Sequence, residues 1–288
     1  MMKVTVVDMG NYNYKYDGAK GVGVFSSKYT KEPQAYPEGM ERIELDGIVT
    51  YIGIGKLERE FNKSDKNFLP QLLYAICKAN EDQAIISTNL TMLLPAVQMP
   101  LKEKVVKKVK DKTFKVFFNG TPKTISIKEV LVLPEGYAGY FNLNAKDRKE
   151  DLLLLDMGSR TVNMDVIIDG KINKMETLPK GSLDLATNIM KIENAKGKKY
   201  TEEDIERLVN KGKIKVDDVT YEMFLDDILD LIKNHVDINN YKVVCFGGLS
   251  IWLKEYIKNK IEDVTILDNA LVANVEGAKI ASKAIWHI

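Results

Sequence analysis

Two stretches of this sequence share one pattern, Val4-Thr5-Val6-Val7-Asp8-Met9-Gly10 near the start and Leu152-Leu153-Leu154-Leu155-Asp156-Met157-Gly158 past the middle. Each is an apolar run that ends in Asp-Met-Gly, which predicts a buried strand followed by a tight turn. A single copy is most simply explained as turn chemistry. Two copies, each closing a strand, favour a repeated functional tip, one in each half of the chain.

Both tips carry residue types that can bind a phosphate and its metal ion. A carboxylate at the end of a strand, here Asp8 or Asp156, can hold a hydrated divalent cation. The backbone N–H groups of the tight turn can bind phosphate oxygens, and Lys15 can supply a positive charge. Neutral hydrogen-bond donors are available from Asn11, Asn13 and Ser159.

A further glycine pair, Gly247-Gly248, follows the apolar stretch 243–246 and precedes an expected helix. Two residues without side chains let a ligand approach the backbone, and a helix N-terminus favours an anion. A simple strand-to-helix turn explains the pair equally well. Other nucleotide signatures fail, because Thr50 and Leu57 break a P-loop pattern and neither Asp-Met-Gly turn has the dinucleotide glycine fingerprint.

The bulk composition is that of an ordinary globular protein. A length of 288 residues favours two lobes. A net charge of +1 argues against direct DNA binding, so the lysine-rich segment 102–115 is interpreted as a solvated face. Cys77 and Cys245 lie in apolar runs and are expected to be buried free thiols in a reducing compartment. With no signal peptide or membrane-spanning run in the sequence, we expect a cytoplasmic protein.

Strands that alternate with helices predict an α/β protein with largely buried sheets. The polar stretch 142–150 separates the expected lobes, 1–148 and 149–269, and a C-terminal helix of about 270–288 returns to the first lobe. The expected strands include 3–7, 12–16, 21–26, 84–87, 115–119, 123–127, 130–133, 152–155, 161–168, 171–178, 243–246 and 264–266. The expected helices are 70–79, 102–112, 182–192, one that starts after Thr201, 221–235, 251–261 and 274–285.

The order of these motifs resembles that of the actin superfamily of nucleotide-binding proteins. The motifs are Asp8-Met9-Gly10-Asn11 with Lys15, Pro134-Glu135-Gly136, Asp156-Met157-Gly158-Ser159, and Val244-Cys245-Phe246-Gly247-Gly248. Supporting matches lie at 49–53, 118–120, 130–136 and 274–277. The details are most similar to the plasmid-segregation proteins of the ParM type and their archaeal and phage relatives. The resemblance runs from Val4 to about Ala281.

The resemblance implies a two-lobed actin-like ATPase fold, in which each lobe is a mixed sheet flanked by helices and the nucleotide lies in the cleft between the lobes. Asp8 and Asp156 would hold Mg²⁺, and Glu135 and Asp156 would be the catalytic residues that orient the attacking water. The implied nucleotide-binding residues are Asp8, Gly10, Asn11, Tyr12, Asn13, Lys15, Gly158, Ser159, Arg160, Thr161, Gly181, Gly247, Gly248 and Leu249. Arg160-Thr161 departs from the usual Gly-Thr or Thr-Thr of the second tip.

The same resemblance implies a function. The chain would hydrolyse ATP or GTP with Mg²⁺, polymerise with itself into filaments, and segregate plasmid DNA through a DNA-bound adaptor protein, with no direct contact to DNA or membrane. One alternative is a small-molecule kinase of the same superfamily, whose catalytic acid would be Asp165 or Asp184. Another is a nucleotide-dependent binding module that does not polymerise.

Overall fold

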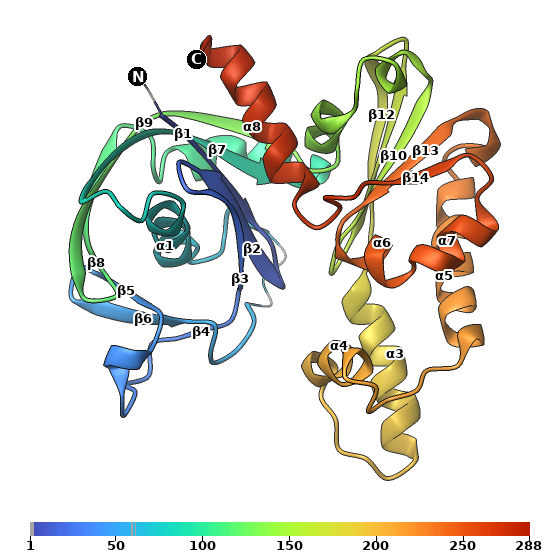
Figure 1. Cartoon of the computed structure of the whole chain (residues 1–288), viewed down its shortest axis with the longest axis horizontal. Coiled ribbons are helices and arrows are strands. Elements are labelled where there is room, and N and C mark those ends of the chain that lie inside the picture. Colours follow the sequence, from blue (N-terminus) through green and yellow to red (C-terminus); the bar gives the residue numbers. More distant parts are fainter. Residues whose placement is uncertain (1–2, 59, 61) are drawn as a thin grey trace. The chain divides into compact units, whose positions relative to one another are not determined.

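The computed structural model describes residues 3–58, 60 and 62–288, which form two compact units (Figure 1). Unit 1 comprises Met1–Asn142 and Val272–Ile288, and unit 2 comprises Leu143–Leu271. Each unit contains one mixed β-sheet with helices packed on it, which confirms the predicted α/β class. Within the described part of the chain, every helix is too short or too polar to span a lipid bilayer.

The sheet of unit 1 has the strand order β3-β2-β1-β7-β9-β8-β5-β6-β4. Its three central strands, β1, β7 and β9, run parallel, and the other neighbours pair antiparallel. The strands are β1 (Lys3–Met9), β2 (Asn13–Gly18), β3 (Gly21–Ser26), β4 (Tyr29–Thr30), β5 (Arg42–Leu45), β6 (Ile48–Ile52), β7 (Ile85–Leu94), β8 (Lys112–Phe118) and β9 (Thr121–Pro134). Short 3₁₀ turns lie at Pro37–Gly39, Ala96–Leu101 and Tyr137–Asn142.

Helix α1 (Leu69–Ala79) is the centre of the unit 1 core. The sheet curls around this helix, so that strands lie on several sides of it (Figure 1). Almost every residue of α1 is buried, including the polar Gln71. A helix that is enclosed in this way must be apolar around most of its circumference. The run Leu-Pro-Gln-Leu-Leu-Tyr-Ala-Ile-Cys meets that requirement, and Cys77 is a buried free thiol, as predicted.

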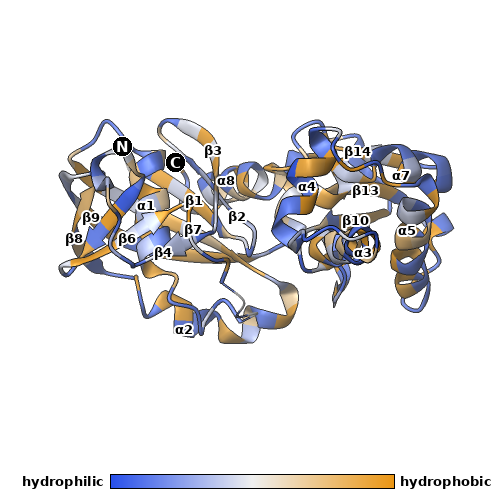
Figure 2. Cartoon of the chain, turned by 90° about the horizontal axis from the view of Figure 1, so that it is seen from below, coloured by the Kyte–Doolittle hydropathy of each residue, from blue (hydrophilic) through white to orange (hydrophobic). Residues whose placement is uncertain are grey.

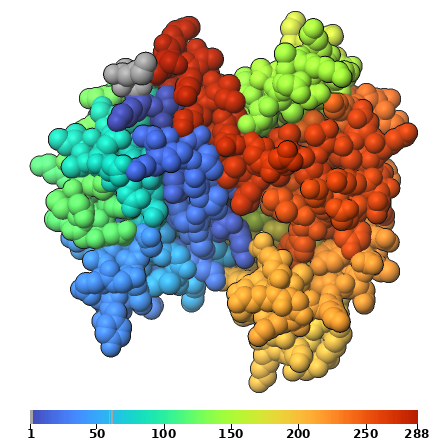
Figure 3. Space-filling view, in the orientation of Figure 1, coloured from blue at the N-terminus to red at the C-terminus, as the bar shows by residue number. Residues whose placement is uncertain are grey.

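Helix α8 (Ala273–Trp286) packs against β1, β2 and the turn at Tyr137–Asn142. Figures 1 and 3 both show this C-terminal helix beside the N-terminal strand. The contact is close at Gly277, where an added Cβ would lie 2.0 Å from the carbonyl oxygen of Ala138. The hydroxyls of Thr91 and Ser282 form a buried hydrogen bond of 2.6 Å between β7 and α8.

The sheet of unit 2 has the order β12-β11-β10-β13-β14, with β10, β13 and β14 parallel. Its apolar face is covered by helices, of which α5 shows hydrophobic and hydrophilic residues alternating along its length (Figure 2). The strands are β10 (Leu152–Met157), β11 (Val162–Ile168), β12 (Lys171–Leu178), β13 (Lys242–Phe246) and β14 (Val264–Ile266). The helices are α3 (Ser182–Ala195), α4 (Glu202–Asn210), α5 (Asp218–Lys233), α6 (Gly248–Trp252) and α7 (Lys254–Lys260), with 3₁₀ turns at Asp147–Lys149 and Ile238–Asn240.

The two sheets repeat one arrangement. In unit 1 an antiparallel meander, β3-β2-β1, is followed by the parallel neighbour β7. In unit 2 the meander β12-β11-β10 is followed by the parallel neighbour β13. The two Asp-Met-Gly motifs occupy equivalent positions, because each closes the strand that lies between the meander and the parallel neighbour.

The structure differs from the expected elements in four places. The expected helix 102–112 is only α2 (Lys102–Val106), because the chain turns away and Asp111 adopts a left-handed φ of 56°. The expected strands 123–127 and 130–133 are one strand, β9. The expected strand 84–87 continues to Leu94, because Thr88, Asn89 and Thr91 are polar residues buried inside a sheet. The expected helix 251–261 is divided at Leu253 into α6 and α7.

Gly277→Ala should destabilise unit 1. In most helix interiors this change adds about 1 kcal/mol of stability. Here the new methyl group would clash with the Ala138 carbonyl, so the free energy of unfolding should fall by about 1–3 kcal/mol. Urea denaturation followed by circular dichroism measures the difference. Gly39→Ala is the matched control, because an added Cβ there meets nothing within 4 Å; an increase in stability for Gly277→Ala would contradict the prediction.

Candidate functional site

The first site lies at the carboxyl edge of the parallel strands of unit 1. Asp8 at the end of β1 pairs in register with Leu93 of β7, and Leu94 pairs with Pro134 of β9. Glu135 directly follows Pro134, and its backbone N–H donates to the carbonyl of Leu94 at 2.8 Å. Two carboxylates that are far apart in the sequence therefore meet at one edge, which is where open α/β sheets place their ligands.

The ammonium group of Lys63 joins these two carboxylates. Its Nζ lies 3.1 Å from Asp8 Oδ1 and 3.4 Å from the carbonyl oxygen of Leu93, and it forms an ion pair with Glu135 Oε1. All three charged residues are buried, with exposed fractions of 2% for Lys63, 4% for Asp8 and 8% for Glu135. Glu135 is thus a buried, paired acid rather than an exposed loop residue.

A second lysine holds the other oxygen of Asp8. Lys15 on β2 is directly opposite Asp8 in the hairpin, and its Nζ donates to Asp8 Oδ2 at 3.1 Å. Burial by itself would raise the pKa of Asp8, but Lys15 and Lys63 outweigh that effect and lower it to about 2. Burial by itself would lower the pKa of Lys63, and Glu135 and Asp8 together raise it instead. Asp8 and Lys63 are therefore both charged at neutral pH.

The turn between β1 and β2 contains the other predicted residues of the first tip. Gly10 is required there, because an added Cβ would lie 2.2 Å from the carbonyl oxygen of Asn13. The hydroxyl of Ser27 donates to the carbonyl of Asn11 at 2.6 Å, and Ser27 N–H donates to the carbonyl of Tyr12 at 3.0 Å. The side chain of Asn11 accepts a hydrogen bond from Lys66 Nζ.

Lys63 and Lys66 come from a segment that the sequence analysis did not assign, Asn62-Lys63-Ser64-Asp65-Lys66-Asn67. The segment is fixed to unit 1 at two points. The backbone N–H of Lys63 donates to Gln98 Oε1 at 2.9 Å, and Lys108 Nζ donates to the carbonyl of Ser64 at 2.7 Å. The segment carries no recognisable motif, and only the fold reveals that two of its lysines turn inward.

The oxygens around Lys63 Nζ are of the kind that a hard divalent cation prefers. Two carboxylates and one backbone carbonyl converge on a single cationic atom, and Mg²⁺ takes oxygen ligands of these types. The donor set therefore fits the implied metal, with the lysine ammonium as a stand-in cation. Among the described residues, no cluster of three or more His, Cys, Asp or Glu side chains offers a different metal site.

The second site lies at the tip between β10 and β11 in unit 2. Gly158 N–H donates to the Thr161 carbonyl at 2.9 Å, which closes the turn. The first residues of α3 hold the tip from outside, because Ser182 N–H donates to the Gly158 carbonyl and Leu183 N–H to the Ser159 carbonyl. Gly181 is packed so closely on the tip that an added Cβ would lie 2.3 Å from the Ser159 carbonyl oxygen.

Asp156 is oriented by a chain of polar groups across three strands. Asn163 Nδ2 donates to Asp156 Oδ2 at 3.3 Å, and Thr177 Oγ1 donates to Asn163 Oδ1 at 3.0 Å. On the opposite side, Gly247 has a φ of 89°, and an added Cβ would lie 2.8 Å from Asp156 Oδ1. The glycine thus lets the turn after β13 approach the carboxylate.

Asp165 is a second carboxyl group near Asp156. It is fully buried in β11, and neither of its carboxylate oxygens has a hydrogen-bond partner among the described residues. Burial, with a smaller contribution from the charge of Asp156, holds the pKa of Asp165 well above its usual range. Asp165 was a candidate catalytic acid for a kinase, but a side chain without exposed surface cannot reach a bound acceptor.

The structure brings the predicted residues together within each unit. Unit 1 gathers Asp8, Gly10, Asn11, Tyr12, Asn13, Lys15 and Glu135 around the end of β1. Unit 2 gathers Asp156, Gly158, Ser159, Arg160, Thr161, Gly181 and Gly247 around the end of β10. Leu249 is fully buried in the core of unit 2. The roles of these residues remain predictions.

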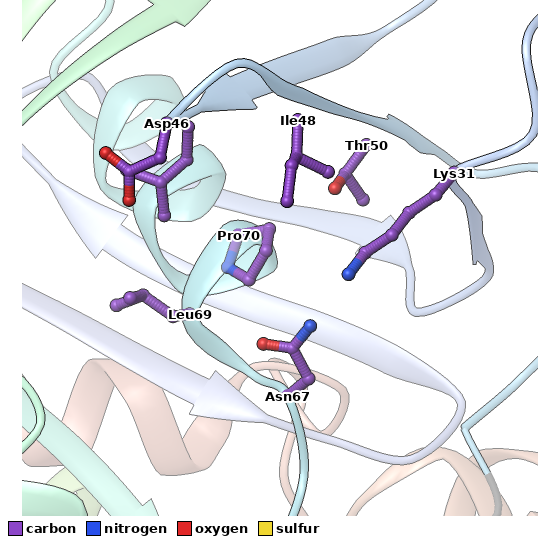
Figure 4. A pocket seen from close by; sticks show the side chains of 8 residues that line it. Lys31, Asp46, Ile48, Thr50, Asn67, Leu69 and Pro70 are labelled. Carbon is purple, nitrogen blue, oxygen red and sulfur yellow. The ribbon is translucent and has the colours of Figure 1, made fainter.

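A separate pocket of unit 1 lies at the start of α1 (Figure 4). Figure 4 shows the side chains of Lys31, Thr50 and Asn67 pointing into it, next to Pro70. The hydroxyl of Thr50 is buried and has no hydrogen-bond partner within the described ranges. The volume of about 120 Å³ is below the roughly 300–1,000 Å³ of typical ligand pockets, and none of the predicted site residues lines it, so we assign no function to it.

Comparison with solved structures places this geometry in a known fold. The archaeal actin homolog Ta0583 in complex with ADP matches with a TM-score of 0.79 and 16% identity, over 98% of this chain and 100% of that one. The apo pSK41 ParM protein matches with a TM-score of 0.73 and 17% identity, over 99% and 98%. The filament structure of AlfA from B. subtilis plasmid pLS32 matches with a TM-score of 0.66 and 22% identity, over 97% and 98%.

The chain has the actin-like fold. The expected resemblance to prokaryotic actin-like proteins of the ParM type is thereby confirmed at the level of the fold. Sequence comparison alone does not find this likeness, since no protein-family model and no curated protein sequence matches the chain. At identities of 13–22%, the likeness rests on the strand arrangement.

Asp165→Asn should stabilise this protein at neutral pH. The unfolded wild-type chain releases the Asp165 proton above pH 4, whereas the folded chain retains it to higher pH, so wild-type stability falls as the pH rises. Asparagine has no such penalty, and the variant should gain about 1 kcal/mol or more at pH 7, since one pKa unit corresponds to about 1.4 kcal/mol. The gain should vanish near pH 3.5.

Urea denaturation of both proteins at several pH values measures this difference. Asp169→Asn is the control, because Asp169 is exposed in a turn whose left-handed φ of 51° suits asparagine. A gain for Asp165→Asn that is independent of pH would contradict the assignment.

Proposed function

We propose that this protein is an actin-like nucleoside triphosphatase that polymerises with ATP or GTP and Mg²⁺. The observation that carries the proposal is the pair of Asp-tipped strands, one per unit, in equivalent positions of an actin-like fold. Units 1 and 2 are proposed to be the two lobes of that fold. The structures of relatives that name ADP or AMPPNP as a ligand support a nucleotide as the ligand class.

In this proposal each tip performs part of the phosphate chemistry. Asp8 and Asp156 would hold Mg²⁺, which would neutralise phosphate charge. Lys15 and the N–H groups of the Gly10 turn bind phosphate oxygens in unit 1. The turn Gly158–Thr161, backed by the first residues of α3, does the same in unit 2. Phosphoryl transfer to water needs positioning and charge neutralisation more than a strong base.

Two acidic residues are proposed to position the attacking water. Glu135 lies at the carboxyl edge next to Asp8, and its carboxylate is held by Lys63. Asp156 is held by the Asn163–Thr177 chain. The Asn163–Thr177 chain orients Asp156 to accept a hydrogen bond from water, and the end of β9 brings Glu135 to the same edge as Asp8.

The proposed biological task is the segregation of plasmid DNA in the cytoplasm through a DNA-bound adaptor protein. Support comes from the whole-length match to AlfA, whose structure is a plasmid-encoded filament, and to ParM. Direct DNA binding is not part of the proposal. In the lysine-rich segment 102–115, Lys108 holds the carbonyl of Ser64 and Lys110 pairs with Glu129 at 2.8 Å.

A small-molecule kinase has less support. Of its two candidate acids, Asp165 is fully buried. Asp184 accepts a hydrogen bond of 2.8 Å from the backbone N–H of Gly181 and so caps α3. One carboxyl group is therefore enclosed in the core and the other caps a helix, so neither is placed to act on an acceptor.

The central test is sedimentation of the protein with ATP or GTP and Mg²⁺, with phosphate release followed in parallel. We expect filaments that pellet with nucleotide and remain soluble without it, and phosphate release without any added acceptor. A protein that stays monomeric with both nucleotides would refute the polymerisation part. Phosphate release that requires a sugar or carboxylic acid would favour the kinase.

Asp156→Asn should impair hydrolysis more than binding. The amide keeps the hydrogen bond to Asn163 but loses the charge that organises the metal and the water, so kcat should fall about 10²–10⁴-fold. Nucleotide affinity should change less than about tenfold, because other groups hold the phosphates. Single-turnover hydrolysis and nucleotide titration separate the two effects, with Asp169→Asn as the control. Equal losses of affinity and turnover would contradict this division.

Glu135→Gln should give filaments that assemble but disassemble slowly. The amide retains the shape of the side chain but positions water poorly, so phosphate release should slow about 10²-fold or more. Light scattering after a nucleotide pulse measures the filament lifetime. The control is Glu129→Gln, an exposed acid on the same strand. Unchanged phosphate release in Glu135→Gln would remove this residue from its role.

A further inference from the structure

Lys63 occupies the position that a divalent cation would need in unit 1. Its Nζ has three oxygen acceptors, Asp8 Oδ1, Glu135 Oε1 and the Leu93 carbonyl. An ammonium group has three protons, so this set uses its full hydrogen-bonding capacity. A metal ion that binds Asp8 through Oδ1 therefore competes with the lysine for the same oxygens.

The formal charges of the four groups that contact one another, Asp8, Glu135, Lys15 and Lys63, sum to zero. Asp8 and Glu135 contribute two negative charges, and Lys15 and Lys63 contribute two positive charges at contact distance. All four groups are largely shielded from water, with side-chain exposures of 3–15%. A divalent cation that enters this cluster alone leaves an excess of two positive charges in a poorly solvated site, which is strongly unfavourable.

A nucleoside triphosphate changes this balance, because its phosphates bring several negative charges. The Lys63 side chain can then leave the carboxylates for a phosphate oxygen, since it is long and has four rotatable bonds. Its backbone need not move, because the N–H of Lys63 is held by Gln98 at 2.9 Å and the next residue by Lys108 at 2.7 Å. Gln98 and Lys108 hold the backbone in place, so only the Lys63 ammonium group changes its partners from carboxylates to a phosphate.

We propose that Lys63 is a positioning residue that holds Asp8 and Glu135 together in the nucleotide-free protein and excludes free divalent cations from them. Metal and nucleotide then enter together, because only the phosphates compensate the displaced ammonium group. The second statement rests on the proposed nucleotide function. The first concerns the metal alone and can be tested without nucleotide.

The test is binding of Mn²⁺ to the nucleotide-free protein, measured by electron paramagnetic resonance of the free ion. Wild-type protein should show no tight site that depends on Asp8. Lys63→Met opens Asp8 Oδ1 and leaves one net negative charge, so it should bind Mn²⁺ more tightly by about 5–150-fold, the usual range of coupling between two sites. Adding Asp8→Asn to Lys63→Met should abolish the gain.

Lys108→Met is the matched control. It removes one positive charge and one tether from the same segment without touching a carboxylate, so its Mn²⁺ affinity should equal that of the wild type. An equal gain for Lys108→Met would show a general charge effect and overturn the proposal. Equal affinity of wild type and Lys63→Met would also overturn it.

Two further measurements test the proposal if Lys63→Met does not fold. Lys63→Met combined with Glu135→Gln restores local neutrality and still leaves Asp8 Oδ1 open, so this double variant should bind Mn²⁺ more tightly than wild type and less tightly than Lys63→Met. Tight binding of Mn²⁺ to nucleotide-free wild type that is lost in Asp8→Asn would overturn the proposal without any lysine variant. Because no arm contains nucleotide, a failure of the proposed hydrolysis or polymerisation leaves these results unaffected.

Discussion

Parallel pairing of β1, β7 and β9 is the constraint on which the first site depends. Parallel strands end at the same edge of a sheet, and their register is fixed because one face of the sheet packs on α1 and the other on α8. A slip of one residue in β9 would turn Glu135 away from Asp8. Packing of the apolar core therefore fixes the positions of the charged residues. The ion pairs then adjust only the side chains.

The two tips share a motif but differ in how their aspartates are held. Asp8 is paired with two lysines, which lower its pKa to about 2. Asp156 accepts a hydrogen bond from the Asn163 amide, which accepts one from the Thr177 hydroxyl, and it lies near the buried carboxyl group of Asp165. The first tip thus pairs its aspartate with lysines, whereas the second aligns its aspartate through a chain of side-chain hydrogen bonds. An internal repeat of sequence has acquired two different electrostatic environments.

Both tips, the meander strands and α1 could be predicted from the sequence, because each has a local signal. Apolar runs give the strands, and Asp and Gly give the turns. β7 was predicted too short, since its buried Thr88 and Asn89 pair with groups on other elements, such as the Thr5 hydroxyl at 3.0 Å from Thr88 Oγ1. Lys63 could not be found at all, because its contacts depend on the register of three strands. Local patterns predict elements, whereas the pairing of distant polar residues requires the fold.

The division of unit 1 into two segments has a consequence for biosynthesis. Unit 2 is one continuous stretch, but unit 1 needs residues 272–288, whose helix covers β1 and β2. During translation the ribosome releases β1 long before α8 exists. The nascent chain therefore carries a first sheet whose α8-facing side is uncovered while unit 2 is synthesised, and the site around Asp8 acquires its full support only when α8 emerges. Chaperones that shield exposed apolar surface would have their longest window of action on this first sheet.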